Sequence, residues 1–272
     1  ILLVMGLAAT GVPSQDLEAR LMELVSHPVG FIGFGLAAQL AIGLAAVLPA
    51  MLSRIPFRQR LGLLPAKLPT WSFPVVMVGS LFTAGLGILA VVLMAEVIPP
   101  EENSFATLME NMTPAWSILF ILFISLAPGL MEELLFRGYL QTRLLKRWNP
   151  VFAILVSSAL FGLAHITPHR IAFAFIVGLY LGVLAWRTGS IWPGVLCHAF
   201  INGSIQVLNM GQKFGVWSES TANIAAYTMF GLGAVCFGVS VWLLIKASSD
   251  SPRRDSRIVA HGRRMSPRLA QA

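Results

Sequence analysis

Seven long apolar segments are the feature of this sequence that most restricts its fold. They lie near residues 29–51, 73–98, 115–141, 151–166, 171–186, 190–208 and 224–245. Charged residues make up only 11% of the chain, against about 25% in soluble domains, which is too few to cover a water-facing surface. Backbone polar groups in hydrocarbon must be satisfied internally, and continuous apolar runs achieve this as helices. We therefore expect an all-α, polytopic membrane bundle of about seven to eight transmembrane helices.

The two ends of the chain differ from these segments. Residues 1–12 are apolar but shorter than the about 20 residues that a span needs, so we expect them to be the end of a first helix. The polar, arginine-rich tail is expected to be disordered and to contact anionic lipid head groups. We divide the chain into four parts: N-terminal transmembrane helices with an interfacial segment (1–114), catalytic core helices (115–208), a C-terminal transmembrane helix (209–247) and the basic tail (248–272).

Lysine and arginine residues indicate the orientation of the bundle. Outside the tail, most of them lie in connections that alternate crossings place on one side: Arg54, Arg58, Arg60, Lys67, Arg143, Lys146, Arg147, Arg187 and Lys246. The positive-inside rule makes that side cytoplasmic, together with the C-terminus. His169, Arg170 and Lys213 fall on the other side. The segment 53–71 is expected to lie at the cytoplasmic interface as a short amphipathic stretch.

Net charge would otherwise suggest a different partner. A value of +7 in a soluble protein is typical of nucleic-acid binding, but here the positive residues mark membrane orientation, so we expect no nucleic-acid partner. The compact connections and the lack of extra domains favour the inner membrane of a bacterium as the location.

The segment 115–141 contains ionisable residues that an apolar helix does not need. A charged group at the centre of a span costs at least about 2.5–3.5 kcal/mol, so it is a functional candidate by default. Arg137 follows Glu133 by four residues on the same face, where an ion pair forms readily. Glu132 points about 100° away from Glu133. The two acids can therefore differ, with Glu133 held charged by Arg137 and Glu132 available as a general base.

Two later segments each contribute a histidine. His165 ends the segment 151–166, and His198 is followed by Asn202 one helical turn later on the same face. Measured from the cytoplasmic basic residues, Glu132, His198 and His165 lie about 16, 16 and 21 Å deep at 1.5 Å per residue. Comparable depth from one side is what a shared site requires.

These residues form a pattern that resembles a known family. Glu132-Glu133-x-x-x-Arg137-Gly138, Phe161-x-x-x-His165 and His198-x-x-x-Asn202 resemble, in order and spacing, the three signature motifs of the CPBP family. That family joins type II CAAX prenyl endopeptidases with bacteriocin-processing and Abi-type membrane proteins, and the resemblance covers about residues 115–205. It implies a bundle of about eight helices with a catalytic cavity open toward the cytoplasm. It also implies hydrolysis of a peptide bond, within or beside the membrane, in a membrane-associated substrate.

The resemblance also implies a role for each motif residue. Glu132 is similar to the base that activates water, with assistance from His165. His198 and Asn202 are similar to the pair that stabilises the oxyanion. Two further residues are implied to support the site: Glu133 and Arg137. Amide hydrolysis needs a base for water and donors for the oxyanion, so the residue types suit the reaction.

The sequence leaves alternatives open for the cofactor and for the function. Glu132, His165 and His198 are a candidate ligand set for zinc, but the chain has no His-Glu-x-x-His motif, and the favoured mechanism requires no metal. A non-proteolytic scaffold or bacteriocin immunity protein could use the same polar set for helix packing. A proton-coupled transporter is a third reading, which the lack of an evident internal repeat disfavours. The sequence does not specify the substrate or whether it is prenylated.

Overall fold

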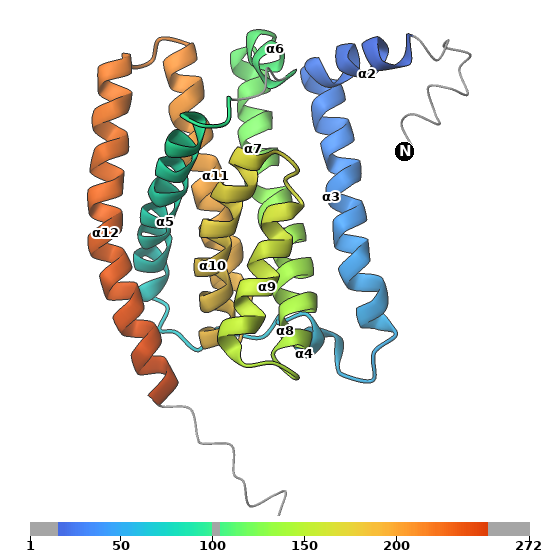
Figure 1. Cartoon of the computed structure of the whole chain (residues 1–272), viewed down its shortest axis with the longest axis vertical. Helices are drawn as coiled ribbons and strands as arrows, with labels where there is room; N and C mark the ends of the chain where they lie inside the picture. Colours follow the sequence, from blue (N-terminus) through green and yellow to red (C-terminus); the bar gives the residue numbers. More distant parts are fainter. Residues whose placement is uncertain (1–15, 100–103, 250–272) are drawn as a thin grey trace, which may run out of the picture.

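The computed structural model describes residues 16–99 and 104–249, which form helices and their connections with no strand in either range (Figure 1). The elements are α2 (Leu17–Ser26), α3 (Pro28–Met51), α4 (Phe57–Arg60), α5 (Ser72–Ala95), α6 (Ser104–Glu110), α7 (Pro114–Glu133), η1 (Leu134–Gln141), α8 (Thr142–Leu144), α9 (Pro150–Leu163), α10 (Pro168–Thr188), α11 (Trp192–Lys213) and α12 (Glu219–Ser249). The all-α prediction is confirmed. The expectations for residues 1–12 and for 250–272 of the tail fall outside the described residues.

All seven apolar segments form helices, and several are long enough to span a bilayer. By length and composition, five spans qualify among the described residues: α3, α5, the continuous run Pro114–Leu144, α10 and α12. The apolar helix α9 has only 14 residues, a length of about 21 Å. The chain is therefore an integral membrane protein built as a polytopic helical bundle, in which α9 stops part of the way across.

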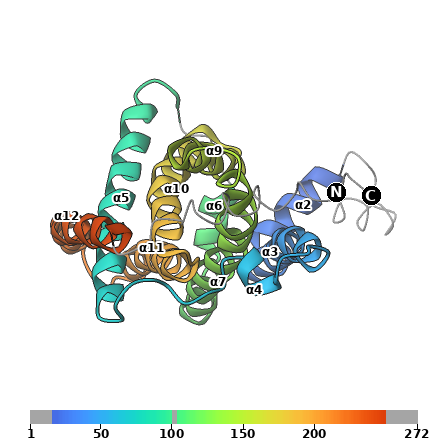
Figure 2. The same cartoon turned by 90° about the horizontal axis from the view of Figure 1, so that it is seen from below.

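The helices surround a central space from several sides. Figure 2 shows α7, α9, α10 and α11 grouped at the centre, with α3 at one edge and α12 at the other. The α3 helix packs on α7 and η1, while α12 packs on α5, and α5 packs on α10 and α11. Residues far apart in the sequence therefore meet in the middle of the bundle.

Local sequence signals fix where the central helices begin and end. Helices α7, α9, α10 and α11 each have proline in the first turn, where its missing N–H costs no hydrogen bond. Asn149 caps α9 by accepting a hydrogen bond from the backbone N–H of Phe152 at 2.9 Å. Helix α10 ends at Gly189, whose φ of 67° is the left-handed conformation that glycine adopts without strain.

Most of the segment 53–71 is exposed, and only residues 60–62 are buried. Only Phe57–Arg60 is helical, and Leu61 is fully buried against α3, η1 and Ile191. The backbone N–H of Ile191 donates to the carbonyl of Gly62 at 3.0 Å. A Cβ on Gly138 would lie 2.5 Å from the carbonyl oxygen of Leu61, so the close approach of this segment to η1 requires glycine there. The segment thus closes one end of the central bundle.

The segment 115–141 does not continue as a regular α-helix. From Leu134 to Gln141 the hydrogen bonds take the wider π-helical pattern. This pattern is rare in proteins, and where it occurs it is often at a functional site. The two acids lie in the last turn of α7, and Arg137 lies within the π-helix. The change in helix type therefore falls within the cluster of ionisable residues.

Candidate active site

The predicted ion pair between Glu133 and Arg137 is present at the centre of the bundle. Nη1 of Arg137 lies 2.7 Å from Oε1 of Glu133, and both side chains are fully buried. Nη2 of Arg137 donates to the carbonyl of Gly178 at 3.2 Å. The guanidinium also stacks on the ring of Phe161, 4.2 Å from its centroid. An arginine in this setting is compensated by charge, hydrogen bonding and cation–π contact together.

Glycines on α10 allow polar groups of η1 to reach its backbone. Gln141 donates from Nε2 to the carbonyl of Gly182 at 2.8 Å, one turn beyond the contact of Arg137 with Gly178. A Cβ on Gly178 would lie 3.1 Å from Nη2 of Arg137, and one on Gly182 would lie 2.9 Å from Oε1 of Gln141. The small residues therefore permit a buried polar layer, which we call the polar floor: Glu133, Arg137 and Gln141.

Glu132 lies above this floor and faces a different set of neighbours. Its Oε1 accepts a hydrogen bond from Nε2 of Gln39 at 2.8 Å. Its Oε2 has no hydrogen-bond partner among the described residues and lies 3.9 Å from Nε2 of His198. That separation is longer than a hydrogen bond, so Oε2 makes no direct bond to His198.

Gln39 is a site residue that the sequence analysis missed. It comes from α3, far from the motifs, and it is the one polar side chain in the 24 residues from Pro28 to Met51. That isolation was the available signal, because a carboxamide in a span needs a hydrogen-bond partner. Its contact fixes one oxygen of Glu132, and the other oxygen stays buried without a partner among the described residues.

His198 and Asn202 lie one turn apart on α11, as predicted, and each is anchored. Nδ1 of His198 lies 3.3 Å from Oε1 of Glu133. A carboxylate only accepts, so Nδ1 carries the hydrogen and Nε2 faces Glu132. Nδ2 of Asn202 donates to the carbonyl of Ile124 at 3.0 Å. An amide nitrogen has two hydrogens, so one N–H of Asn202 remains for another acceptor.

His165 follows the end of α9 and is half-buried. Its Nδ1 lies 3.0 Å from the carbonyl oxygen of Phe161, which only accepts, so Nδ1 is protonated and Nε2 is left with its lone pair. The rings of His165 and His198 both make edge contacts with Phe161, at centroid distances of 5.1 and 5.7 Å. Phe161 therefore orients both histidines as well as Arg137, which explains an aromatic residue at this motif position.

The residue after His165 has an unusual backbone. Ile166 has a φ of 68°, and a β-branched side chain in the left-handed region is strained. It lies in the short connection that turns α9 into α10. The strain therefore falls beside a candidate catalytic histidine.

These side chains meet in one cavity of about 920 Å³. The candidate catalytic residues all line it: Glu132, His165, His198 and Asn202. Gln39, Gln206 and His169 add polar groups to its wall, which is otherwise largely apolar. Glu133 and Arg137 do not line the cavity and lie beneath it, in the polar floor. The arrangement combines an acid, a basic imidazole nitrogen and N–H donors around a space that a peptide can enter.

The candidate zinc ligand set is not assembled in this geometry. Over residues 16–99 and 104–249, no group of three or more His, Cys, Asp or Glu side chains is placed to hold a metal ion. Glu132, His165 and His198 therefore do not fit a zinc site as arranged, and the chemistry below uses the side chains alone.

The direction of the cavity conflicts with the sequence expectations. Its outer wall is formed by Val25 of α2, by His165–Thr167 of the α9–α10 connection, and by His169 and Arg170 in the first turn of α10. These lie toward the end of the bundle that carries α2 and α6, opposite the basic connections (Figure 1). The sequence analysis expected both the basic connections and the cavity opening on the cytoplasmic side. Because they lie at opposite ends of the bundle, only one of these two expectations can be correct.

Comparison with known proteins finds similarity over the central helices. Residues 114–204 match a family model described as "Type II CAAX prenyl endopeptidase Rce1-like". A Bacillus subtilis (strain 168) protein named "Putative membrane peptidase YdiL" is 27% identical over 92 residues, which are 34% of this chain and 38% of that protein. The chain thus matches less than half the length of that relative. No solved structure matches the chain significantly.

The buried ion pair generates a prediction about stability. Glu133→Leu and Arg137→Met should each lower the free energy of unfolding by about 3–5 kcal/mol, because each leaves one uncompensated buried charge. The double variant should be more stable than either single variant. Unfolding of the purified protein in mixed micelles measures this double-mutant cycle. Additive losses in the double variant would show that the two side chains are not coupled.

Proposed function

Because the chain is a CPBP-family protein through its Rce1-like segment, residues 114–204, we propose that it is an intramembrane endopeptidase that uses glutamate-activated water. The observation that carries this proposal is the free oxygen of Glu132. Oε2 is buried in the wall of the cavity, has no partner among the described residues, and lies 3.9 Å from Nε2 of His198, while His165 lines the same cavity. A carboxylate that helix packing leaves unused is what a general base requires.

The first step adds water to the peptide carbonyl. Oε2 of Glu132 takes a proton from water as the water oxygen bonds to the carbonyl carbon. Nε2 of His165, left with its lone pair by the Phe161 contact, accepts a hydrogen bond from the same water and orients it. The C–N bond then breaks, and the proton on Glu132 passes to the departing nitrogen. The products are a carboxylic acid and an amine, and one proton transfer between them gives a carboxylate and an ammonium ion.

The second requirement is stabilisation of the oxyanion. The free N–H of Asn202 and, with its ring doubly protonated, Nε2–H of His198 donate to the developing negative charge. Glu133 holds Nδ1 of His198, and Arg137 holds Glu133 in place. Removal of one oxyanion donor typically costs about 10²–10³ in kcat.

The scaffold alternative explains only part of the same residue set. Asn202, Arg137 and Gln141 make hydrogen bonds to the backbones of neighbouring helices, as packing residues do. Oε2 of Glu132 has no partner among the described residues, so packing does not account for it. The hydrolase reading gives it a role, and we prefer it for that reason.

Substrate and location are part of the proposal. The substrate is a membrane-associated peptide or protein, of CAAX type or of the bacteriocin-processing type. We place the chain in the inner membrane of a bacterium with a cytoplasmic C-terminus. The basic connections and the basic tail then contact anionic lipid head groups.

Glu132→Gln tests the proposed base. The substitution keeps the shape of the side chain and removes the proton acceptor, so cleavage should fall by at least about 10²–10⁴-fold while the protein stays folded. Purified protein in liposomes is mixed with a membrane peptide, and the new N-terminus is sequenced. Glu96→Gln is the matched control, because Glu96 is exposed at the end of α5 and does not line the cavity. Full activity of Glu132→Gln would remove Glu132 from the mechanism.

Gln39→Leu tests whether the contact from α3 positions Glu132. Its loss lets the carboxylate rotate, and we expect kcat to fall by up to about 100-fold with little change in KM. The free energy of unfolding should fall by only about 1 kcal/mol, which is the net contribution of one hydrogen bond. Gln59→Leu serves as the comparison, because Gln59 is exposed in α4 and does not line the cavity. Equal kinetic losses in the two variants would contradict a specific role for Gln39.

A further inference from the structure

One end of the catalytic cavity is closed by buried side chains. The polar floor of Glu133, Arg137 and Gln141 is at most 1% exposed, and Phe136 beside it is 8% exposed. Arg137 and Gln141 are bonded to the backbone of α10, and Leu61 packs beneath against Gly138. A peptide approaching from this end meets a packed, hydrogen-bonded layer.

The other end of the cavity is open because α9 is short. Helix α9 ends at Leu163, and Figure 1 shows that the α9–α10 connection stops short of the upper ends of α3 and α12. The cavity wall continues past this connection to Val25 of α2, Val91 near the end of α5 and Gln206 of α11. We call this opening the mouth; it is bordered by Val25, Val91, His165–Thr167, His169, Arg170 and Gln206.

Basic residues lie mainly at the closed end. The described residues place nine lysines and arginines there, with no acidic residue: Arg54, Arg58, Arg60, Lys67, Arg143, Lys146, Arg147, Arg187 and Lys246. The end with the mouth has three, Arg20, Arg170 and Lys213, together with acidic residues that include Glu23, Glu96, Glu110 and Glu219. By the positive-inside rule the closed end is cytoplasmic, so the mouth opens to the opposite side of the membrane.

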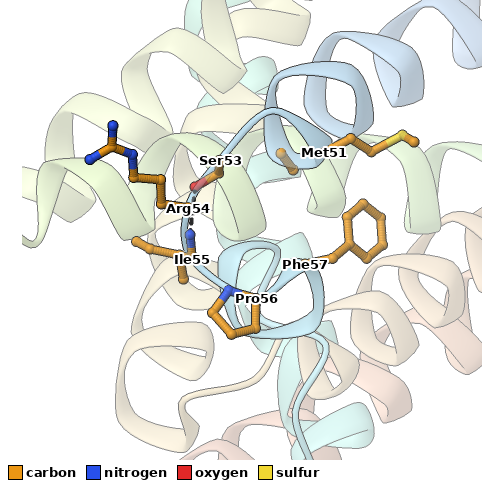
Figure 3. A pocket seen from close by; sticks show the side chains of 7 residues that line it. Met51, Ser53, Arg54, Ile55, Pro56 and Phe57 are labelled. Carbon is orange, nitrogen blue, oxygen red and sulfur yellow. Dashed lines mark hydrogen bonds between the residues drawn. The ribbon is translucent and has the colours of Figure 1, made fainter.

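A second hollow at the closed end does not offer another route. It has a volume of about 550 Å³ and is lined by Ala50, Met51 and residues 53–57 of the α3–α4 turn (Figure 3). Within it, the backbone N–H of Ile55 donates to Oγ of Ser53 at 3.2 Å. It shares no lining residue with the catalytic cavity. The hollow is therefore a separate surface feature.

The polar atoms along the cavity suit an extended peptide that enters from the mouth. Four buried atoms in its wall have no hydrogen-bond partner among the described residues: Nε2 of His169, Oε1 of Gln206, Oε1 of Gln39 and Oε2 of Glu132. They extend from the mouth to Glu132, which lies just above the polar floor. An extended chain presents an N–H and a C=O at every residue, so it can satisfy these groups in sequence.

From the closed floor, the open mouth and the charge asymmetry, we propose that the site takes its substrate from the non-cytoplasmic face. The substrate class is then a translocated polypeptide, cut in an extended segment close to its membrane anchor. A prenylated C-terminus held at the cytoplasmic face would meet the floor. Cleavage of this substrate rests on the proposed function, whereas the direction of the cavity does not.

Cysteine labelling tests the direction without any need for activity. Thr167→Cys places a thiol at the mouth, where the threonine side chain caps nothing, and Gln59→Cys places one at the exposed closed end. Both are made in a Cys236→Ala background, and the fully buried Cys197 is kept as a silent thiol. An impermeant maleimide added to intact spheroplasts should label Thr167→Cys, and should label Gln59→Cys only after permeabilisation. Labelling of Thr167→Cys only after permeabilisation would overturn the proposal.

A pair of reporters tests the substrate class. Both carry the same membrane segment, with the same extended flank displayed outside or inside the cell, and they are expressed with wild-type protein or with Glu132→Gln. Wild type should cut only the outside flank, and Glu132→Gln should cut neither. Cleavage of the inside flank would overturn the proposed direction and keep the protease. Cleavage of neither flank, with labelling as expected, would instead count against the protease and leave the direction standing.

Discussion

The fully buried ion pair between Glu133 and Arg137 is the interaction on which the rest of the site depends. A single charge in the middle of a bilayer is costly, so neither residue is tolerated there without the other. Their pairing, with the carbonyl of Gly178 and the ring of Phe161, makes a rigid polar layer inside an apolar bundle. That layer fixes His198 through Nδ1 and closes the cavity on one side.

The adjacent acids divide structural and chemical work between them. Oε1 of Glu133 contacts Arg137 and His198, and Oε1 of Glu132 is held by Gln39. Oε2 of each acid has no partner among the described residues, but only Glu132 lines the cavity. One helix can supply both because consecutive residues point in directions about 100° apart. The short α9 completes the arrangement, since it places His165 at the edge of a cavity within the depth of the membrane. The structure thus joins a buried, ion-paired support below to a carboxylate that lines the cavity above.

Much of the fold and of the site was predictable from the sequence, because a charged side chain in an apolar segment must pair with another polar group or face a polar cavity. The helices, the pairing of Glu133 with Arg137, and the meeting of Glu132 with His198 follow from spacing and depth. Three features did not follow. Gln39 is distant in sequence and belongs to no motif, the π-helix around Arg137 has no composition signal, and the direction of the cavity depends on where α9 ends in three dimensions. Each is set by packing between helices, which sequence periodicity does not report.

The central claim is that the acid of α7 and the imidazole of α11 act as one hydrolytic unit. The most direct measurement is a double-mutant cycle on kcat/KM for peptide cleavage in liposomes, with Glu132→Gln, His198→Gln and both together. If the two residues act on the same transition state, the double variant should lose about as much activity as the more impaired single variant. A loss in the double variant equal to the product of the two single losses would show independent contributions and would contradict the account.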